Sequence, residues 1–200
     1  MLKTRQTSRR HDLDTPEGCA DPRRTRSADD FVVLEEELDL DAGVLKADRA
    51  PFNVLEIIDR VVVEARRRHG ESPAIVLQAG GPSDALGDGV LLEIAFGNVL
   101  DNALRFAQSR VTVSIKTGER LQVEVRDDGP GVPADMTDRI FDRFVRTQAS
   151  NGASPQYQDG YGLGLSITRG LMEAMGGSAR ASAAKPGLAL MLELECAPHE

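Results

Sequence analysis

Apolar residues recur every three or four positions in four parts of the chain, which is the period of an amphipathic helix. The clearest of these segments contains three consecutive arginines shortly before Gly70, a suitable residue to end a helix. Another begins just after Asp88, whose carboxylate is a good N-cap. This period predicts helices over residues 54–69, 91–107, 134–146 and 163–175.

Strict alternation of apolar and polar residues predicts strands over 111–115 and 121–125, joined through Gly118 into an antiparallel hairpin with one buried face. A further strand is predicted over 74–79 and two more around a later Pro-Gly turn, whereas 83–89 is predicted as a loop. With the helices, this order predicts an α+β fold. We expect a two-layer α/β sandwich with a mixed, mostly antiparallel sheet and helices on one face.

Charge and composition narrow the possible partners. The formal net charge is −8 and the pI is near 5.0, which argues against broad electrostatic binding to nucleic acid or an anionic membrane. No apolar run approaches the roughly 18 residues of a spanning helix. Cys19 and Cys196 lie far apart and show no disulfide or zinc pattern. We expect a reduced, cytoplasmic chain without direct membrane contact, although its parent protein could be membrane-anchored.

Two asparagines interrupt the apolar helix predicted over 91–107. Asn98, Asn102 and Arg105 are spaced i, i+4 and i+7, so they share one stripe of that helix. Amide oxygens are hard ligands that suit Mg²⁺, and a guanidinium suits phosphate. The stripe is therefore either a magnesium and phosphate site or a solvent-facing surface.

The segment "VRDDGPGVP" follows directly on an alternating strand. Asp127 ends the strand, while Gly129 and Gly131 allow the backbone to turn sharply and to approach a ligand closely. A carboxylate in that position could accept a hydrogen bond from an exocyclic amine such as that of adenine. The alternative is an ordinary Asp-Gly-Pro turn.

Three alternating glycines, Gly160, Gly162 and Gly164, stand where a polar loop meets a predicted helix. Backbone amides at a helix N-terminus can cradle phosphate, and the preceding loop could act as a lid. The spacing matches neither the dinucleotide-binding fingerprint nor the P-loop.

The order of these three features resembles the nucleotide-binding domain of the GHKL ATPases, and within them the sensor histidine kinases. "GNVLDNALRFA" looks like their N box, "DDGPGVP" like the first glycine box, "IFDRFVR" like the F box and "GYGLGLSITRGLMEAMGG" like the last glycine box. "KPGLALMLEL" resembles their final glycine-containing hairpin in a weaker form. The resemblance covers residues 51–198 and implies a sandwich of the GHKL (Bergerat) type.

The resemblance also implies roles for individual residues in binding ATP and Mg²⁺. The two asparagines would hold the metal on the phosphate side, Asp127 would read adenine, and the F-box aromatics Phe141 and Phe144 would anchor the lid. Arg143 and Arg146 either reach the γ-phosphate or form a solvated face. Asn98 and Arg105 are the candidate catalytic residues, and Asn98 and Asn102 the candidate metal ligands. The expected nucleotide-binding positions are Asn98, Asn102, Arg105, Phe106, Asp127, Gly129, Gly131, Phe141, Arg146, Gly160, Gly162, Leu163 and Gly164.

A phosphoacceptor histidine is harder to assign. "RHDLDTPEG" partly matches the family's H box, with His11 at the phosphoacceptor position, but Asp14 and Glu17 depart from it and no long helix follows. His11 is therefore either the phosphoacceptor or a chance match. We expect residues 1–28 to be disordered or degenerate, 29–50 to be the remnant of a dimerisation-hairpin exit or linker, and 51–200 to be the ATP-binding domain.

The resemblance implies transfer of the γ-phosphoryl group of ATP to a histidine, and from there to an aspartate of a response-regulator receiver domain. The histidine would lie on a dimerisation hairpin in cis or in a partner chain. Two other functions remain open: a serine kinase of the anti-sigma type, and a non-catalytic module that binds ATP or a partner.

Overall fold

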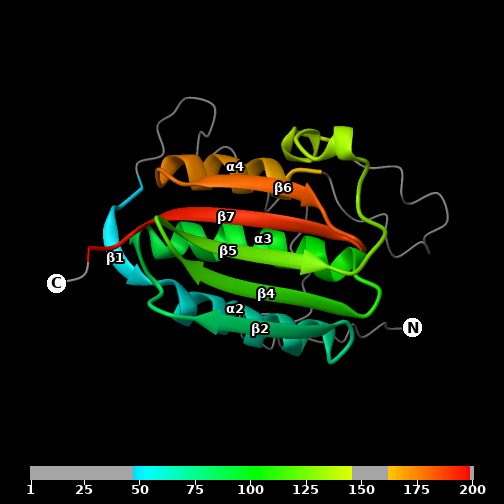
Figure 1. The fold of residues 1–200 in the computed structure, drawn as a ribbon, viewed down its shortest axis with the longest axis horizontal. Helices are drawn as coiled ribbons and strands as arrows, with labels where there is room; N and C mark the ends of the chain where they lie inside the picture. The colour runs from blue at the N-terminus through cyan, green and yellow to red at the C-terminus, as the bar shows by residue number, and fades with distance from the viewer. Residues whose placement is uncertain (1–46, 146–161, 199–200) are drawn as a thin grey trace, which may run out of the picture.

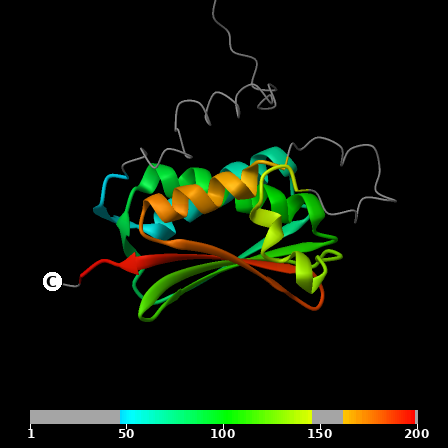
Figure 2. The same ribbon diagram turned by 90° about the horizontal axis from the view of Figure 1, so that it is seen from above.

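The computed structural model describes residues 47–145 and 162–198, which form a two-layer sandwich of one sheet and a layer of helices (Figure 1). Turning the molecule by 90° shows α2, α3 and α4 together over one face of the sheet (Figure 2). The elements are β1 (Ala50–Asn53), α2 (Val54–His69), β2 (Ala74–Gly80), β3 (Asp84–Gly87), α3 (Gly89–Phe106), β4 (Arg110–Thr117), β5 (Arg120–Asp127), η1 (Ala134–Met136), η2 (Arg139–Phe141), α4 (Gly164–Ala174), β6 (Ser178–Ala183) and β7 (Leu188–Cys196).

Within these residues the strands form one sheet in the order β1-β3-β7-β5-β4-β2, with β6 also paired to β7. The β2–β4 pair is parallel and every other pair is antiparallel. Val123 on β5 lies opposite Ile115 on β4 and Leu192 on β7, so the apolar side chains line up on the face under the helices. The predicted mixed, mostly antiparallel sandwich is confirmed.

The ends of α2 and α3 follow from local side-chain chemistry. Asn53 accepts a hydrogen bond from the Glu56 backbone N–H (3.1 Å), and Gly70 closes the other end of α2 at φ 75°. Asp88 accepts from the backbone N–H of Val90 (2.9 Å) and so begins α3, as predicted. These caps satisfy N–H groups that have no partner inside the helix.

The core lies between α3 and the sheet. Side chains of Leu92, Phe96, Val99 and Leu100 on α3 are fully buried, and they meet the buried apolar rows of β4, β5 and β7. Burying a side chain of this size contributes roughly 1.5–3 kcal/mol. Because α3 is the central helix of this core, residues on its remaining stripe are held in fixed positions.

The structure departs from the prediction in three places. Residues 83–89 were expected to be a loop, but Asp84–Gly87 is β3, and β1 was not expected at all. The two strands pair with each other, and β3 also pairs with β7. Segments this short do not reveal such pairing. The helix expected over 134–146 is instead two 3-10 turns, because the backbone is extended at Asp142 and has φ 62° at Phe144.

Among the described residues, none of the helices is both long and apolar enough to cross a membrane. Cys196 carries a free thiol. The segment expected to be disordered (1–28), most of the linker segment 29–50 and the polar loop before α4 lie outside the described residues.

Candidate nucleotide-binding site

The sequence motifs meet at one end of the molecule, at the right in Figure 1. The C-terminal half of α3 leads to this end, where β5 finishes at Asp127 and α4 begins at Gly164. A side-chain contact joins α3 to α4 there, because the Asn98 amide donates to the carbonyl oxygen of Gly164 (3.2 Å). Helix α3 therefore connects the asparagine motif with both glycine-rich motifs.

The predicted asparagine stripe lies at the edge of the core. Asn98, Asn102 and Arg105 are all partly exposed, whereas Val99 and Ala103 between them are buried. The hydrogen bond to Gly164 directs the Asn98 amide nitrogen toward α4, which leaves its oxygen as the atom that could face a cation. Two neutral amide oxygens at a half-exposed surface fit a metal such as Mg²⁺, which keeps most of its waters.

Asp127 is a buried carboxylate, only 3% exposed. Burial raises the pKa of its carboxyl above the ordinary value, and hydrogen bonds from the backbone N–H groups of Gly129 and Leu188 offset this only in part. The Gly129 bond to Asp127 Oδ1 measures 2.8 Å. A carboxylate with two oxygens can accept more than these bonds, so Asp127 can read a donor such as an exocyclic amine.

The backbone around Asp127 is too crowded for side chains at two glycines. A Cβ on Gly129 would lie 2.2 Å from the Phe106 carbonyl oxygen, and a Cβ on Gly187 would lie 1.9 Å from the carbonyl oxygen of Asp127. Gly187 also has φ +95°, a conformation that L side chains rarely adopt. Gly129 was predicted as a site residue. Gly187 was missed, although its Pro-Gly turn was visible in the sequence.

Sequence reasoning also missed Asp128. Its carboxylate accepts hydrogen bonds from the backbone N–H groups of Gln108 (2.8 Å), Ser109 (3.0 Å) and Arg110 (3.1 Å), and from the Ser109 hydroxyl (2.5 Å). No local signal distinguished it, because the three amides are 18 to 20 residues away in the chain.

The F-box aromatics contact α4 and the residues just before it. Phe141 is buried, and the Arg169 guanidinium of α4 lies 4.5 Å from its ring centroid and donates to the Asp138 carbonyl oxygen (3.3 Å). Phe144 is 69% exposed, yet its backbone N–H donates to the carbonyl oxygen of Gly162 (3.2 Å). Described residues on either side of 146–161 are therefore joined by a hydrogen bond.

The remaining candidate residues are distributed as follows. Gly131 is partly buried and has φ +69°, and the Phe106 ring lies 5.9 Å from the Arg105 guanidinium carbon. Leu163 is buried, so only its backbone is placed to face a nucleotide, and Arg143 is exposed. His11, Arg146 and Gly160 lie outside the described residues.

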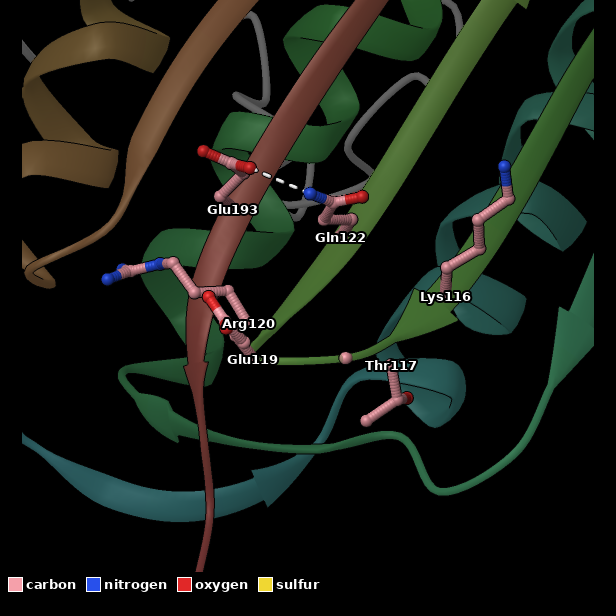
Figure 3. A pocket seen from close by; sticks show the side chains of 7 residues that line it. Lys116, Thr117, Glu119, Arg120, Gln122 and Glu193 are labelled. Carbon is pink, nitrogen blue, oxygen red and sulfur yellow. Dashed lines mark hydrogen bonds between the residues drawn. The ribbon is translucent and has the colours of Figure 1, made fainter.

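A separate hollow of about 350 Å³ lies at the opposite end of β4 and β5 (Figure 3). Most of its lining residues are polar, and Gln122 donates to Glu193 there (2.8 Å). Arg120 donates to the carbonyl oxygen of Gly176, which lies outside the lining (2.7 Å). None of the predicted site residues lines it. We therefore distinguish this hollow from the candidate site at Asp127.

The fold and these contacts define an α/β sandwich whose predicted nucleotide-binding motifs gather around one helix. The chain belongs to the family described as histidine kinase-, DNA gyrase B-, and HSP90-like ATPases, whose model matches residues 87–197. Within that family it is a catalytic, ATP-binding domain of the kind found in two-component sensor histidine kinases.

Individual relatives agree with this assignment. The chain is 38% identical to the sensory/regulatory protein RpfC of Xanthomonas campestris pv. campestris over 162 residues, which cover 73% of this chain and 22% of RpfC. It is 32% identical to the signal transduction histidine-protein kinase BaeS of Escherichia coli over 142 residues, or 68% of this chain and 30% of BaeS. The chain therefore spans less than a third of either relative.

Among solved structures, the mycobacterial sensor histidine kinase MprB matches with a TM-score of 0.62 and 30% identity. The match covers 76% of this chain and 99% of that one. The catalytic domain of the histidine kinase ThkA, at 21% identity and a TM-score of 0.60, supports the fold alone.

Proposed function

We propose that this domain binds Mg·ATP across the C-terminal half of α3, with the adenine at Asp127 and the triphosphate near Asn98, Asn102 and the start of α4. The observation that carries the proposal is that α3 contacts both ends of the site. Asn98 bonds to Gly164, and the Phe106 carbonyl lies against Gly129. Eight residues of helix separate these contacts, or about 12 Å along the axis, which is the scale of an extended nucleoside triphosphate.

The proposed reaction is phosphoryl transfer to a histidine. An imidazole nitrogen attacks the γ-phosphorus, the bond from that phosphorus to the β–γ bridging oxygen breaks, ADP leaves and the imidazole gives up its N–H proton. Positioning and charge neutralisation provide most of the catalysis in such reactions. In this chain Asn98 and Asn102 would hold Mg²⁺, which neutralises phosphate charge, while Arg105 would face the phosphates.

The acceptor histidine and the next partner belong to the same proposal. His11 is one candidate acceptor, and a histidine on a dimerisation hairpin in cis or in a partner chain is the other. From there the phosphoryl group would pass to an aspartate of a response-regulator receiver domain. We place the domain in the cytoplasm, with residues 51–200 as the ATP-binding unit.

Calorimetric titration with Mg·ATP tests the binding site. We expect the parent chain to bind, and Asp127→Asn to lose at least about tenfold in affinity, equivalent to 1.4 kcal/mol, because the amide presents a donor to the adenine amine. We expect Asn102→Ala to bind ATP equally with and without Mg²⁺. Glu193→Gln, at the opposite end of the sheet, should bind as the parent does. An Asp127→Asn variant with parental affinity would contradict the adenine assignment.

Incubation with γ-labelled ATP tests the acceptor. Phosphohistidine is labile in acid, whereas phosphoserine is stable, so the stability of the label separates a histidine kinase from a serine kinase. We expect an acid-labile label, on this chain through His11 or on an added hairpin. Loss of label in His11→Gln with unchanged ATP affinity would assign the acceptor. An acid-stable label would contradict the proposed reaction.

A further inference from the structure

Asp128 joins two segments that are distant in sequence. It directly follows β5, and its carboxylate accepts hydrogen bonds from the backbone N–H groups of Gln108, Ser109 and Arg110. These residues connect the end of α3 at Phe106 to the start of β4 at Arg110. One side chain therefore fixes the whole connection between the two elements.

The geometry is that of an occupied anion site. Consecutive backbone N–H groups that point to one side form a concave nest for a negative charge. Asp128 Oδ1 accepts from all three amides at 2.8 to 3.1 Å, and Oδ2 accepts from the Ser109 hydroxyl at 2.5 Å. Burial opposes ionisation of Asp128, but these hydrogen bonds outweigh it and hold the pKa of the carboxyl well below its ordinary value.

The residues on either side of Asp128 touch the candidate nucleotide site. Asp127 precedes it and is the proposed adenine contact. Gly129 follows it and packs so closely on the Phe106 carbonyl that a Cβ would lie 2.2 Å from that oxygen. Gly129 therefore packs on the last residue of α3, and Asp128 bonds to the residues that directly follow this helix.

We propose that Asp128 is a positioning residue of the nucleotide site, which sets the distance between Asp127 and the end of α3 that carries Arg105 and Phe106. This inference rests on the proposed function. Without the Asp128 bonds, the end of α3 could move relative to Asp127. ATP, which must engage both at once, would then bind more weakly, whereas adenosine, which needs only the base contact, would be affected less.

The chain provides a matched control for a purely structural role. Asp88 caps the other end of α3 and accepts from the backbone N–H groups of Val90 (2.9 Å) and Leu91 (3.3 Å). Asp88→Ala thus removes a carboxylate that bonds to backbone amides of the same helix, far from Asp127. Asp128→Asn keeps an acceptor oxygen but loses the charge, so it should lie between the parent and Asp128→Ala.

The experiment measures Kd for Mg·ATP by calorimetry and for adenosine by NMR titration, at temperatures where circular dichroism shows each variant folded. For Asp128→Ala we expect ATP affinity to fall about tenfold and adenosine affinity to fall less than about threefold. Asp88→Ala should change neither by more than about twofold. The amide signals of Gln108, Ser109 and Arg110 should shift in both Asp128 variants but not in Asp88→Ala.

Three results would overturn the proposal: parental ATP affinity in Asp128→Ala, an equal loss of ATP and adenosine binding, or the same ATP-specific loss in Asp88→Ala. If Asp128→Ala does not fold, the same criteria apply to Asp128→Asn, with an ATP-specific loss of about threefold expected. A parent chain that does not bind ATP would contradict the proposed function instead, while the amide shifts would still report whether Asp128 holds the connection.

Discussion

The two ends of β5 differ in a way that separates the proposed nucleotide site from a surface hollow. At the Arg120 end there is a hollow of about 350 Å³ lined by polar side chains. At the Asp127 end the backbone is so crowded that Cβ atoms would lie 2.2 Å and 1.9 Å from carbonyl oxygens. The predicted nucleotide motifs gather at the crowded end, where a main chain without side chains can approach a ligand closely.

Two carboxylates, one near each end of β5, differ in how well their charge is stabilised. The pKa of Glu193 is lowered overall. Burial acts to raise it, but hydrogen bonds from Ser178 and Gln122 and the charges of Arg180 and Arg120 have the larger effect. Burial also raises the pKa of Asp127, and there the hydrogen bonds do not outweigh it. Neighbouring side chains of this domain bond to Glu193 and stabilise its charge. Asp127 is buried, and its two oxygens can accept further hydrogen bonds, which is typical of a carboxylate that binds a ligand.

The largest effect that we predict comes from a side chain placed in the crowded end. Gly187→Ala combines a clash with the Asp127 carbonyl and a strained φ of +95°, so we expect it to destabilise the fold by roughly 2–4 kcal/mol. Gly118→Ala, at the other end, meets no atom within 4 Å and should change stability by less than about 0.5 kcal/mol. Urea unfolding measures both. Equal effects would remove the contrast between the two ends.

Neutralising the two carboxylates should change stability in opposite directions. The pKa of Asp127 is raised in the folded state, so the parent loses stability as pH rises from the ordinary value of 3.8 through the raised one. Asp127→Asn escapes this loss and should unfold at higher urea concentration than the parent at pH 7.

The pKa of Glu193 is lowered, so its stabilisation is present above the ordinary value of 4.5 and disappears as pH falls through the lowered one. Glu193→Gln should therefore be less stable than the parent at pH 7 and approach it in acid. Urea midpoints at pH 7 and in acid measure both variants. If both variants shift the urea midpoint in the same direction at pH 7, the predicted difference between Asp127 and Glu193 is wrong.

The elements that the sequence predicts correctly are those with a period of their own. Helix α3 and the β4–β5 hairpin bury regular apolar rows, so their residues carry the signal. Strands β1 and β3 exist because of backbone pairing with each other, and the turn at 139–141 packs its Phe141 ring against Arg169 of α4. Such contacts come from the tertiary fold and leave no local pattern.

The same division applies to the candidate site. Residue type and spacing were enough to propose Asn98, Asn102, Asp127 and Gly129, because short sequence motifs indicate their chemistry. They were not enough to propose Asp128 and Gly187. Their importance lies in where other segments approach them, 18 to 20 residues away for Asp128 and at the Asp127 carbonyl for Gly187.

A smaller effect is expected within the hollow. Gln122→Ala removes one hydrogen bond to a carboxylate that keeps its Ser178 partner, so it should cost about 1 kcal/mol. Gln78→Ala, at an exposed position on β2, is the matched control and should be neutral within about 0.5 kcal/mol. Neither variant should change ATP affinity. A tenfold loss of ATP binding in Gln122→Ala would mean that the two ends of β5 are coupled.

The smallest effect concerns the ion pair beside the hollow. Arg49 and Glu195 approach to 2.5 Å, but their side chains are 49% and 52% exposed, so water screens the attraction. A double-mutant cycle with Arg49→Ala and Glu195→Ala should give a coupling energy between about 0.2 and 1 kcal/mol. Repeating it at about 1 M salt, where the Debye length falls to about 3 Å, should reduce the coupling further. A larger coupling energy that salt does not change would mean that the pair is shielded from water. The Arg120 end of β5 would then contain a charge shielded from water, as the Asp127 end does.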